Sequence, residues 1–188
     1  MENEIKSLFD KNIELHRAVR DELAPKIAEA ASLIINAYNQ GRKLLLCGNG
    51  GSAADSQHIA AELVGRFKKE RRGLPAIALT TDTSIMTAVA NDYWYDVLFA
   101  RQVEALGDKD DILIALSTSG NSVNIIRAVE AAKFKGLETI GFLGSNGGKL
   151  EELVDISLLV PSEESDTIQE VHILIGHILC NLIDSKVS

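Results

Sequence analysis

The chain has 188 residues with 19 basic and 27 acidic side chains, which gives a formal charge of −8. This length suits a single domain with a full hydrophobic core, and the 46% share of hydrophobic residues excludes a mainly disordered chain. The acidic balance argues against a general nucleic-acid binder. No secretory signal is visible in the first residues, and no charge-free apolar run is long enough to cross a bilayer. We therefore expect a cytoplasmic protein with no nucleic-acid and no membrane partner.

The N-terminal segment, residues 1–40, is predicted to be helical. Apolar residues recur at helical spacing from about residue 4 to residue 23. Pro25 is placed to begin a second helix, where its missing N–H has no partner to lose, and Gly41 would end that helix. The pattern therefore predicts two consecutive helices.

The segment of residues 41–165 alternates short apolar runs with helical stretches. Strands are expected over residues 43–48, 76–80, 111–116, 139–143 and 156–160. Helices are expected over residues 52–66, 83–90, 96–106, 123–135 and 148–153, with Asp82 or Thr83 and Ser122 as caps. Strands that are apolar throughout and alternate with helices predict a parallel sheet covered on both faces. Ligands of such sheets bind beyond the carboxyl ends of the strands.

The last helix, expected from about Asp166 to Asp184, has apolar residues almost all round. A helix of this kind must be buried on most sides, which subunit contact explains most simply. We therefore predict a homo-oligomer whose centre is formed by the N-terminal helices and the C-terminal interface helix of residues 166–188.

Two further features have structural interpretations. Cys47 and Cys180 lie far apart in apolar stretches and are predicted to be buried, reduced thiols. The run of residues 68–72 has charges of both signs and ends at Gly73, which is typical of a solvated loop.

A glycine-rich loop, Gly48-Asn49-Gly50-Gly51-Ser52, follows the first expected strand. Its glycines let the backbone approach a ligand, and the helix that begins there offers free N–H groups to an anion. The loop also matches part of a dinucleotide fingerprint, but the acidic residue about 20 positions later is absent. A tight strand-to-helix turn without a ligand is the structural alternative.

A second loop, Ser117-Thr118-Ser119-Gly120-Asn121-Ser122, follows the third expected strand. Four hydroxyls, one glycine and a helix N-terminus converge within the space of about one phosphate. Hydroxyl and backbone donors bind a dianion without adding net charge. The absence of a P-loop lysine argues against a nucleotide P-loop, so this loop predicts a phosphate site of another kind.

Polar side chains interrupt two otherwise apolar helices. His58 and Glu62 are spaced i, i+4 on one helix face, where they can share a metal, act as acid and base, or form a surface hydrogen bond. Gln169 and His177 interrupt the last helix, about 12 Å apart along its axis. One metal bound by both would need extended side chains, or ligands from different subunits.

These motifs together resemble a known family. The loops of residues 48–55 and 117–122 resemble the two sugar-phosphate loops of sugar isomerase (SIS) domains. Three stretches resemble, more narrowly, the phosphoheptose isomerase family: His58-xxx-Glu62-xxx-Arg66-Phe67, Asn91-Asp92 and Asp166-xx-Gln169-Glu170-Val171-His172-xxxx-His177. The resemblance covers nearly the whole chain. It implies one SIS domain over residues 1–188, a three-layer α/β sandwich with a five-stranded parallel sheet flanked by helices.

The resemblance also implies a function. It implies a homotetramer that isomerises D-sedoheptulose 7-phosphate to D-glycero-D-manno-heptose 7-phosphate, the first step of ADP-heptose biosynthesis for lipopolysaccharide core or related surface glycans. It implies one Zn²⁺ per subunit, at His58, Glu62, Gln169 and His177. The positions that match substrate contacts are Asn49, Gly50, Gly51, Ser52, Glu62, Asn91, Asp92, Ser117, Thr118, Ser119, Ser122 and Gln169. Trp94 stands where a smaller residue is usual in the family.

Ketose–aldose conversion through an enediol needs a group that takes and returns a carbon-bound proton. Our hypothesis is that Glu62 is this base and His177 the partner acid, with their roles at each step left open. A non-catalytic SIS-domain protein that binds sugar phosphates and regulates a replication initiator is the alternative. Relatives of that kind lack the acidic residue at the position of Glu62. A nucleotide-dependent redox protein is a further alternative that the serine-rich loop disfavours.

Overall fold

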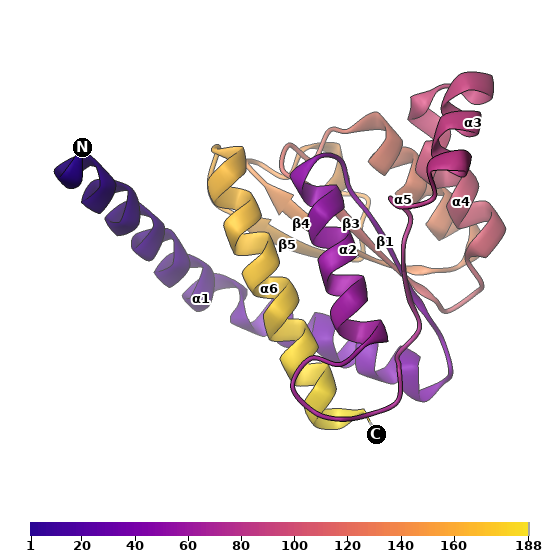
Figure 1. Cartoon of the computed structure of the whole chain (residues 1–188), viewed down its shortest axis with the longest axis horizontal. Coiled ribbons are helices and arrows are strands. Elements are labelled where there is room, and N and C mark those ends of the chain that lie inside the picture. The colour runs from indigo at the N-terminus through magenta and orange to yellow at the C-terminus, as the bar shows by residue number, and fades with distance from the viewer. Residues whose placement is uncertain (188) are drawn as a thin grey trace.

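The computed structural model describes residues 1–187 and contains one five-stranded sheet (Figure 1). All neighbouring strands pair in parallel, in the order β2-β1-β3-β4-β5. The strands are β1 (Leu44–Cys47), β2 (Ala76–Ala78), β3 (Ile112–Ser117), β4 (Glu138–Gly144) and β5 (Ile156–Val160). β2 lies on one side of β1 in the sheet, and the chain then crosses back to place β3 on the other side of β1. Ligands of open α/β sheets bind at such a switch point.

Helices cover both faces of the sheet, which confirms the predicted three-layer α/β sandwich. One face carries α1 (Glu2–Asn39), α2 (Gly51–Val64) and α6 (Ser165–Lys186). The other carries α4 (Leu98–Leu106) and α5 (Val123–Lys135), and α3 (Thr83–Tyr93) lies beside α4. Two short 3₁₀ turns, η1 (Tyr95–Val97) and η2 (Gly148–Leu150), complete the chain.

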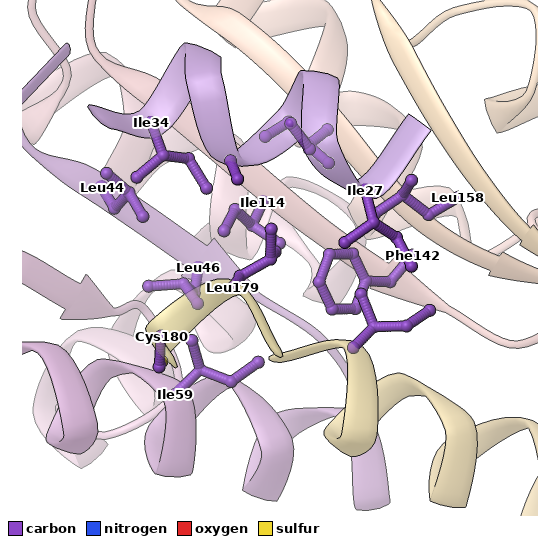
Figure 2. Packing of buried hydrophobic residues seen from close by; sticks show 14 of the residues in the cluster. Ile27, Ile34, Leu44, Leu46, Ile59, Ile114, Phe142, Leu158, Leu179 and Cys180 are labelled. Atoms are coloured by element: carbon purple, nitrogen blue, oxygen red, sulfur yellow. The ribbon is translucent and has the colours of Figure 1, made fainter. Parts of the chain in front are cut away.

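Strands β1, β3, β4 and β5 supply side chains to two separate cores, whereas β2 contributes only to the first. Leu44 of β1 joins the core under α1, α2 and α6, whereas its neighbour Leu45 joins the core under α4 and α5. This alternation follows from the two-residue period of a strand. In the first core, Ile34 of α1, Ile59 of α2 and Leu179 of α6 meet the sheet (Figure 2). Helices α2 and α6, which carry His58, Glu62 and His177, are therefore anchored on the same apolar layer.

The prediction of two N-terminal helices separated at Pro25 is wrong. A single helix, α1, runs from Glu2 to Asn39 with Pro25 inside it. An internal proline removes one backbone hydrogen bond and costs about 3 kcal/mol. The buried residues Leu23 and Ile27 lie on either side of Pro25 and belong to one apolar stripe against the sheet. Burial of that stripe offsets the loss and keeps the helix continuous.

Smaller differences concern helix ends. Helix 96–106 begins as the 3₁₀ turn η1, and the helix expected over residues 148–153 is only the turn η2. Asp82 caps α3 as predicted, by accepting a hydrogen bond from the Ile85 N–H at 2.9 Å. Ser122 occupies the cap position of α5, but its hydroxyl makes no capping hydrogen bond and faces Ser117 instead.

The prediction of a solvated loop over residues 68–72 is wrong for Arg71. The Arg71 side chain is only 4% exposed, and its Nε donates a hydrogen bond to the Asp184 carboxylate of α6 at 2.6 Å. The two buried charges neutralise each other. The prediction for the cysteines is confirmed, since Cys47 and Cys180 are free and buried.

Helices α1 and α6 leave apolar side chains uncovered in the single chain. The N-terminal part of α1 extends away from the body of the molecule (Figure 1). Its exposed apolar residues are Ile5, Leu8, Phe9 and Ile13. Leu174 and Ile178 are also exposed on α6. Within residues 1–187, no helix is both long and apolar enough to span a membrane.

Candidate active site

The two loops predicted from the sequence lie next to each other at the carboxyl ends of β1 and β3. These strands are direct neighbours, and Cys47 pairs with Ala115 at the end of the register. The side-chain amides of Asn49 and Asn124 exchange two hydrogen bonds, each of 2.9 Å. The glycine-rich loop is thus tied to the first turn of α5, immediately after the serine-rich loop.

The glycine-rich loop leads directly into α2. Gly50 adopts a φ of 57°, a left-handed conformation that glycine reaches without steric strain, and occupies the cap position of α2. A Cβ atom on Gly51 would lie 2.3 Å from Oε1 of Gln169, so the absence of a side chain here admits Gln169 of α6 to the loop. The buried Ser52 follows in the first turn of α2.

The serine-rich loop gathers hydroxyl groups before the N-terminus of α5. The hydroxyl oxygens of Ser117 and Ser122 are 3.3 Å apart, and Ser119 Oγ accepts a hydrogen bond from the Asn121 N–H at 3.2 Å. Thr118 Oγ1 lies 3.4 Å from Ser165 Oγ at the start of α6. Hydroxyl donors beside a helix N-terminus suit a phosphate group.

Three side chains from α2 and α6 form a compact cluster of potential metal ligands or acid–base groups. His58 Nε2 lies 3.1 Å from His177 Nε2 and 3.4 Å from Glu62 Oε1. One ligand atom from each of the three residues lies within 4.8 Å of the others. Phe67, in the loop after α2, stacks on the His177 ring with centroids 5.7 Å apart. A carboxylate and two imidazoles can accept, donate and relay protons at this point.

Comparisons with known proteins place this geometry in a family. A model described as "SIS domain" matches residues 8–144. The phosphoheptose isomerase of Nitratiruptor sp. is 58% identical over 168 residues, which cover 89% of this chain and 90% of the relative. That of Geotalea uraniireducens is 52% identical over 99% of this chain and 98% of the relative. The chain belongs to the phosphoheptose isomerase family of SIS-domain proteins.

A solved structure agrees with this membership. A phosphoheptose isomerase from Francisella tularensis aligns with a TM-score of 0.95 and 43% sequence identity, over 98% of both chains. The fold similarity therefore extends to the helical termini, beyond the residues that the SIS model matches.

The histidine–glutamate cluster fits the metal that the family resemblance implies. Two imidazole nitrogens that face each other at 3.1 Å can share one proton or one cation. A tetrahedral zinc with Zn–N bonds of about 2.0–2.1 Å separates two ligand nitrogens by roughly 3.3 Å. The spacing of His58 and His177 is close to this value, and the Glu62 carboxylate supplies an anionic ligand. Gln169, the fourth predicted ligand, is on α6 like His177, and its side chain lies against Gly51 at the start of α2.

Asn91 and Asp92 are the predicted site residues that lie apart from the others. Asn91 donates a hydrogen bond to the Asp92 carboxylate at 2.8 Å, and both side chains are exposed on α3. Among residues 1–187, no hydrogen bond joins either residue to the two loops. None of the residues of α3 is buried in the single chain. A role for this pair in substrate binding stays a prediction.

Sequence reasoning missed several polar and aromatic residues around the cluster and loops. The Tyr95 hydroxyl donates a hydrogen bond to Asn49 Oδ1 at 2.9 Å, and the side-chain amide of Asn124 donates to the same oxygen. Phe67 contacts His177. Tyr95 lies three residues after Asp92, and Asn124 lies two residues after Ser122. Closeness in sequence to these predicted site residues is the only feature of the sequence that could have pointed to them.

Trp94 and Asp55 are two residues near the site in unfavourable environments. Trp94 has a φ of 76°, in the left-handed region that disfavours bulky side chains. Asp55 lies one turn before His58, and its Oδ2 is buried without a hydrogen-bond partner among the described residues. Burial raises the pKa of Asp55, although the nearby His58 lowers it.

Proposed function

We propose that this chain interconverts D-sedoheptulose 7-phosphate and D-glycero-D-manno-heptose 7-phosphate through an enediol. The observation that carries the proposal is the cluster that His58 and Glu62 of α2 form with His177 of α6, because α2 begins at the glycine-rich loop. The 52–58% identity to proteins named phosphoheptose isomerase supports the choice of sugar.

The two loops are suited to the phosphate end of the sugar. The hydroxyls of Ser117 and Ser122 and the free N–H groups at the start of α5 can donate to the phosphate oxygens. Six residues separate Ser52 from His58 on α2, which is about 9 Å along the helix axis. This separation lets an extended sugar chain place its carbonyl end near the cluster while its phosphate stays in the loops.

The proton transfer is assigned to the side chains of the cluster. Glu62 removes the proton from C1 of the ketose and returns it to C2, which requires a carboxylate within reach of both carbons. His177 exchanges the proton between the two oxygens as they change from carbonyl to hydroxyl. Phe67 stacks on one face of the His177 ring, so the ring keeps one orientation during this exchange.

The same cluster would hold a zinc ion, one per subunit, through His58, Glu62, Gln169 and His177. When bound, zinc supplies Lewis acidity that polarises the sugar carbonyl and stabilises the developing oxyanion. Tight metal ligation and proton transfer by one side chain compete, so Glu62 and His177 would have one dominant role at each stage of turnover.

A homotetramer is also part of the proposal, because the single chain leaves apolar surface uncovered. A cavity of about 200 Å³ between α1 and α6 is lined mostly by apolar side chains, including Leu174 and Ile178. The exposed face of α3, with Asn91 and Asp92, offers a second surface that a neighbouring subunit would cover. Light scattering in dilute solution should give four times the chain mass of 20.4 kDa. A monomer mass would contradict this part.

The pathway and the location follow from the family resemblance and are proposed with the activity. The reaction would be the first step towards ADP-heptose for lipopolysaccharide core or a related surface glycan, in the cytoplasm. The alternative, a non-catalytic SIS protein that regulates a replication initiator, is disfavoured because Glu62 is present and sits beside two histidines.

A purified-protein assay with sedoheptulose 7-phosphate tests the activity. The Glu62→Gln variant should lose about 10²–10⁴-fold in kcat, because the general base is removed, while it still binds the sugar phosphate through the two loops, which the substitution leaves unchanged. Glu70→Gln is a matched control, since Glu70 is an exposed carboxylate in the adjacent loop that pairs with Arg66. A Glu62→Gln variant with nearly normal kcat would remove Glu62 from the mechanism.

A further inference from the structure

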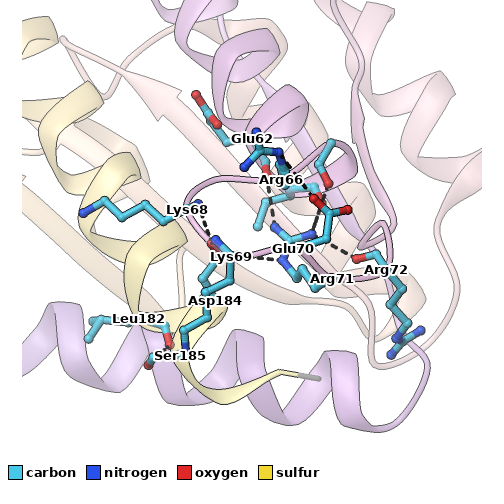
Figure 3. A network of polar contacts seen from close by, with 12 residues as sticks. Glu62, Arg66, Lys68, Lys69, Glu70, Arg71, Arg72, Leu182, Asp184 and Ser185 are labelled. Carbon is cyan, nitrogen blue, oxygen red and sulfur yellow. Dashed lines mark hydrogen bonds and ion pairs between the residues drawn. The ribbon is translucent and has the colours of Figure 1, made fainter.

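Arg71 and Asp184 form a buried ion pair that lies outside the reacting cluster. Their side chains are 4% and 3% exposed, and Arg71 Nε donates to Asp184 Oδ1 at 2.6 Å. Figure 3 shows Arg71 in the loop after α2 and Asp184 on α6, joined by dashed contacts. A charge pair this well buried is costly to desolvate, so its hydrogen bonds must be complete for it to be tolerated.

The Arg71 guanidinium closes the C-terminal end of α2. Its Nη2 donates to the Glu62 carbonyl oxygen at 3.1 Å, and its Nη1 donates to the Leu63 carbonyl oxygen at 2.9 Å. These carbonyl groups belong to the last turn of α2, where no later N–H group of the helix is available to donate to them. A cation at this position also interacts favourably with the helix dipole. Arg71 therefore fixes the main chain of the residue proposed as the general base.

The Asp184 carboxylate fixes the loop that follows α2. Its Oδ2 accepts hydrogen bonds from the N–H groups of Lys68 and Lys69, at 2.7 and 3.1 Å. Although burial alone raises the pKa of Asp184, these bonds and the Arg71 pair hold it below its ordinary value. Phe67 immediately precedes these two anchored amides. The carboxylate thereby holds the loop in the position in which the Phe67 ring stacks on His177.

The two helices also approach each other closely near the cluster. A Cβ on Gly176, the neighbour of His177, would lie 2.7 Å from Ile59 of α2. Small shifts of α2 against α6 would therefore change the distances between His58, Glu62 and His177 directly. Through Arg71, the ion pair joins the last turn of α2 to α6.

We propose that Arg71 and Asp184 are positioning residues for the isomerase reaction, which hold Glu62 and Phe67 in register with His177. Neither residue touches the reacting atoms, and this inference rests on the proposed function of the cluster. A displacement of about 1 Å at a reacting group can reduce a rate by about a hundredfold.

The chain offers a matched control in a second buried ion pair, whose partners lie outside α2 and α6. Asp111 is 2% exposed, accepts hydrogen bonds from the N–H groups of Lys43 and Asp108, and pairs with the Lys43 ammonium at 2.6 Å. Asp111 thus has the same set of partners as Asp184, two backbone amides and one cation, at the amino end of β3. Asp184→Asn and Asp111→Asn should both lower stability, but only the first should disturb the cluster.

The test compares these variants well below their melting temperatures. Asp184→Asn should lower kcat about 10–100-fold with KM within about threefold of wild type, because the phosphate loops are untouched. The imidazole NMR signals of His177, one of four histidines in the chain, should also shift. Asp111→Asn should leave kcat and these signals unchanged.

A second variant keeps the inference testable if Asp184→Asn does not fold. Arg71→Lys retains the charge, but one ammonium cannot reach Asp184 and several carbonyls at once, so kcat should again fall with little change in KM. Unchanged kcat and unchanged His177 signals in the folded Asp184→Asn or Arg71→Lys protein would overturn the inference, as would an equal loss in Asp111→Asn. If wild-type protein itself had no isomerase activity, the proposed function would fail, whereas the NMR comparison would still decide whether the pair positions His177.

Discussion

His172 should make the stability of this protein fall steeply with pH below about 6.5. Its side chain is fully buried on α6, with Nε2 3.0 Å from the Leu143 carbonyl oxygen and the ring edge against Phe142. Its Nδ1 is buried and has no partner among the described residues. Burial lowers the pKa of His172 to about 4, although the hydrogen bond to Leu143 raises it.

The magnitude follows from proton linkage. The ordinary histidine pKa is 6.5, so the unfolded chain takes up a proton near pH 6.5 while the folded protein stays neutral at this site until about pH 4. The stabilising contribution is therefore complete above pH 6.5 and is lost as the pH falls towards 4. Each pH unit in this window removes about 1.4 kcal/mol, which amounts to about 3 kcal/mol at pH 4.

Urea unfolding of wild type and His172→Gln, at one protein concentration and a series of pH values, measures this contribution. Glutamine can still donate to Leu143 but does not titrate, so the other ionisable groups cancel in the comparison. The free energy of unfolding of wild type should fall by about 3 kcal/mol more than that of the variant between pH 7 and pH 4. Parallel curves over this range would refute the assignment of a neutral, buried His172.

Three further predictions concern the core, the phosphate loop and the metal. Phe142→Ala should lower the free energy of unfolding by about 3–5 kcal/mol in a denaturant titration, because it empties a fully buried position of the sheet; a loss below about 1 kcal/mol would contradict this packing. Ser122→Ala should raise KM for the sugar phosphate about tenfold or more with a smaller change in kcat, because a hydrogen bond to a charged group contributes about 1.5–3 kcal/mol; an unchanged KM would remove the hydroxyl from the phosphate site. Dialysis against a chelator should release about one zinc per chain by elemental analysis and lower the melting temperature, because the metal binds only the folded state; a protein purified in the presence of zinc that carries no zinc before dialysis would contradict the metal site.

Local patterns predict most of the fold. Five apolar runs locate the strands, and their alternation with helices gives the parallel sheet and its two covered faces, because these features depend on neighbours in sequence. Pro25 is the main exception. Local propensity favours a break there, but the buried stripe on both sides of Pro25 keeps α1 continuous, and that burial is a tertiary effect.

The site is predictable in its loops and less so in its contacts. The glycine-rich and serine-rich loops are visible because each combines a strand end with a helix start. The spacing of His58 and Glu62 leaves a metal, an acid–base pair and a surface hydrogen bond all open, and only the fold brings His177 to them from 119 residues away. The burial of Arg71 also depends on a partner 113 residues away, so no local pattern could identify it.

The central claim is that this chain moves a proton between C1 and C2 of a phosphorylated seven-carbon sugar. Proton NMR of purified protein with sedoheptulose 7-phosphate in D₂O tests it most directly. We predict conversion to the aldose, with deuterium at C2 wherever the proton held by Glu62 exchanges with solvent, and loss of conversion in Glu62→Gln but not in Glu70→Gln. An unchanged ketose spectrum after prolonged incubation with folded, zinc-supplemented wild-type protein would contradict the account.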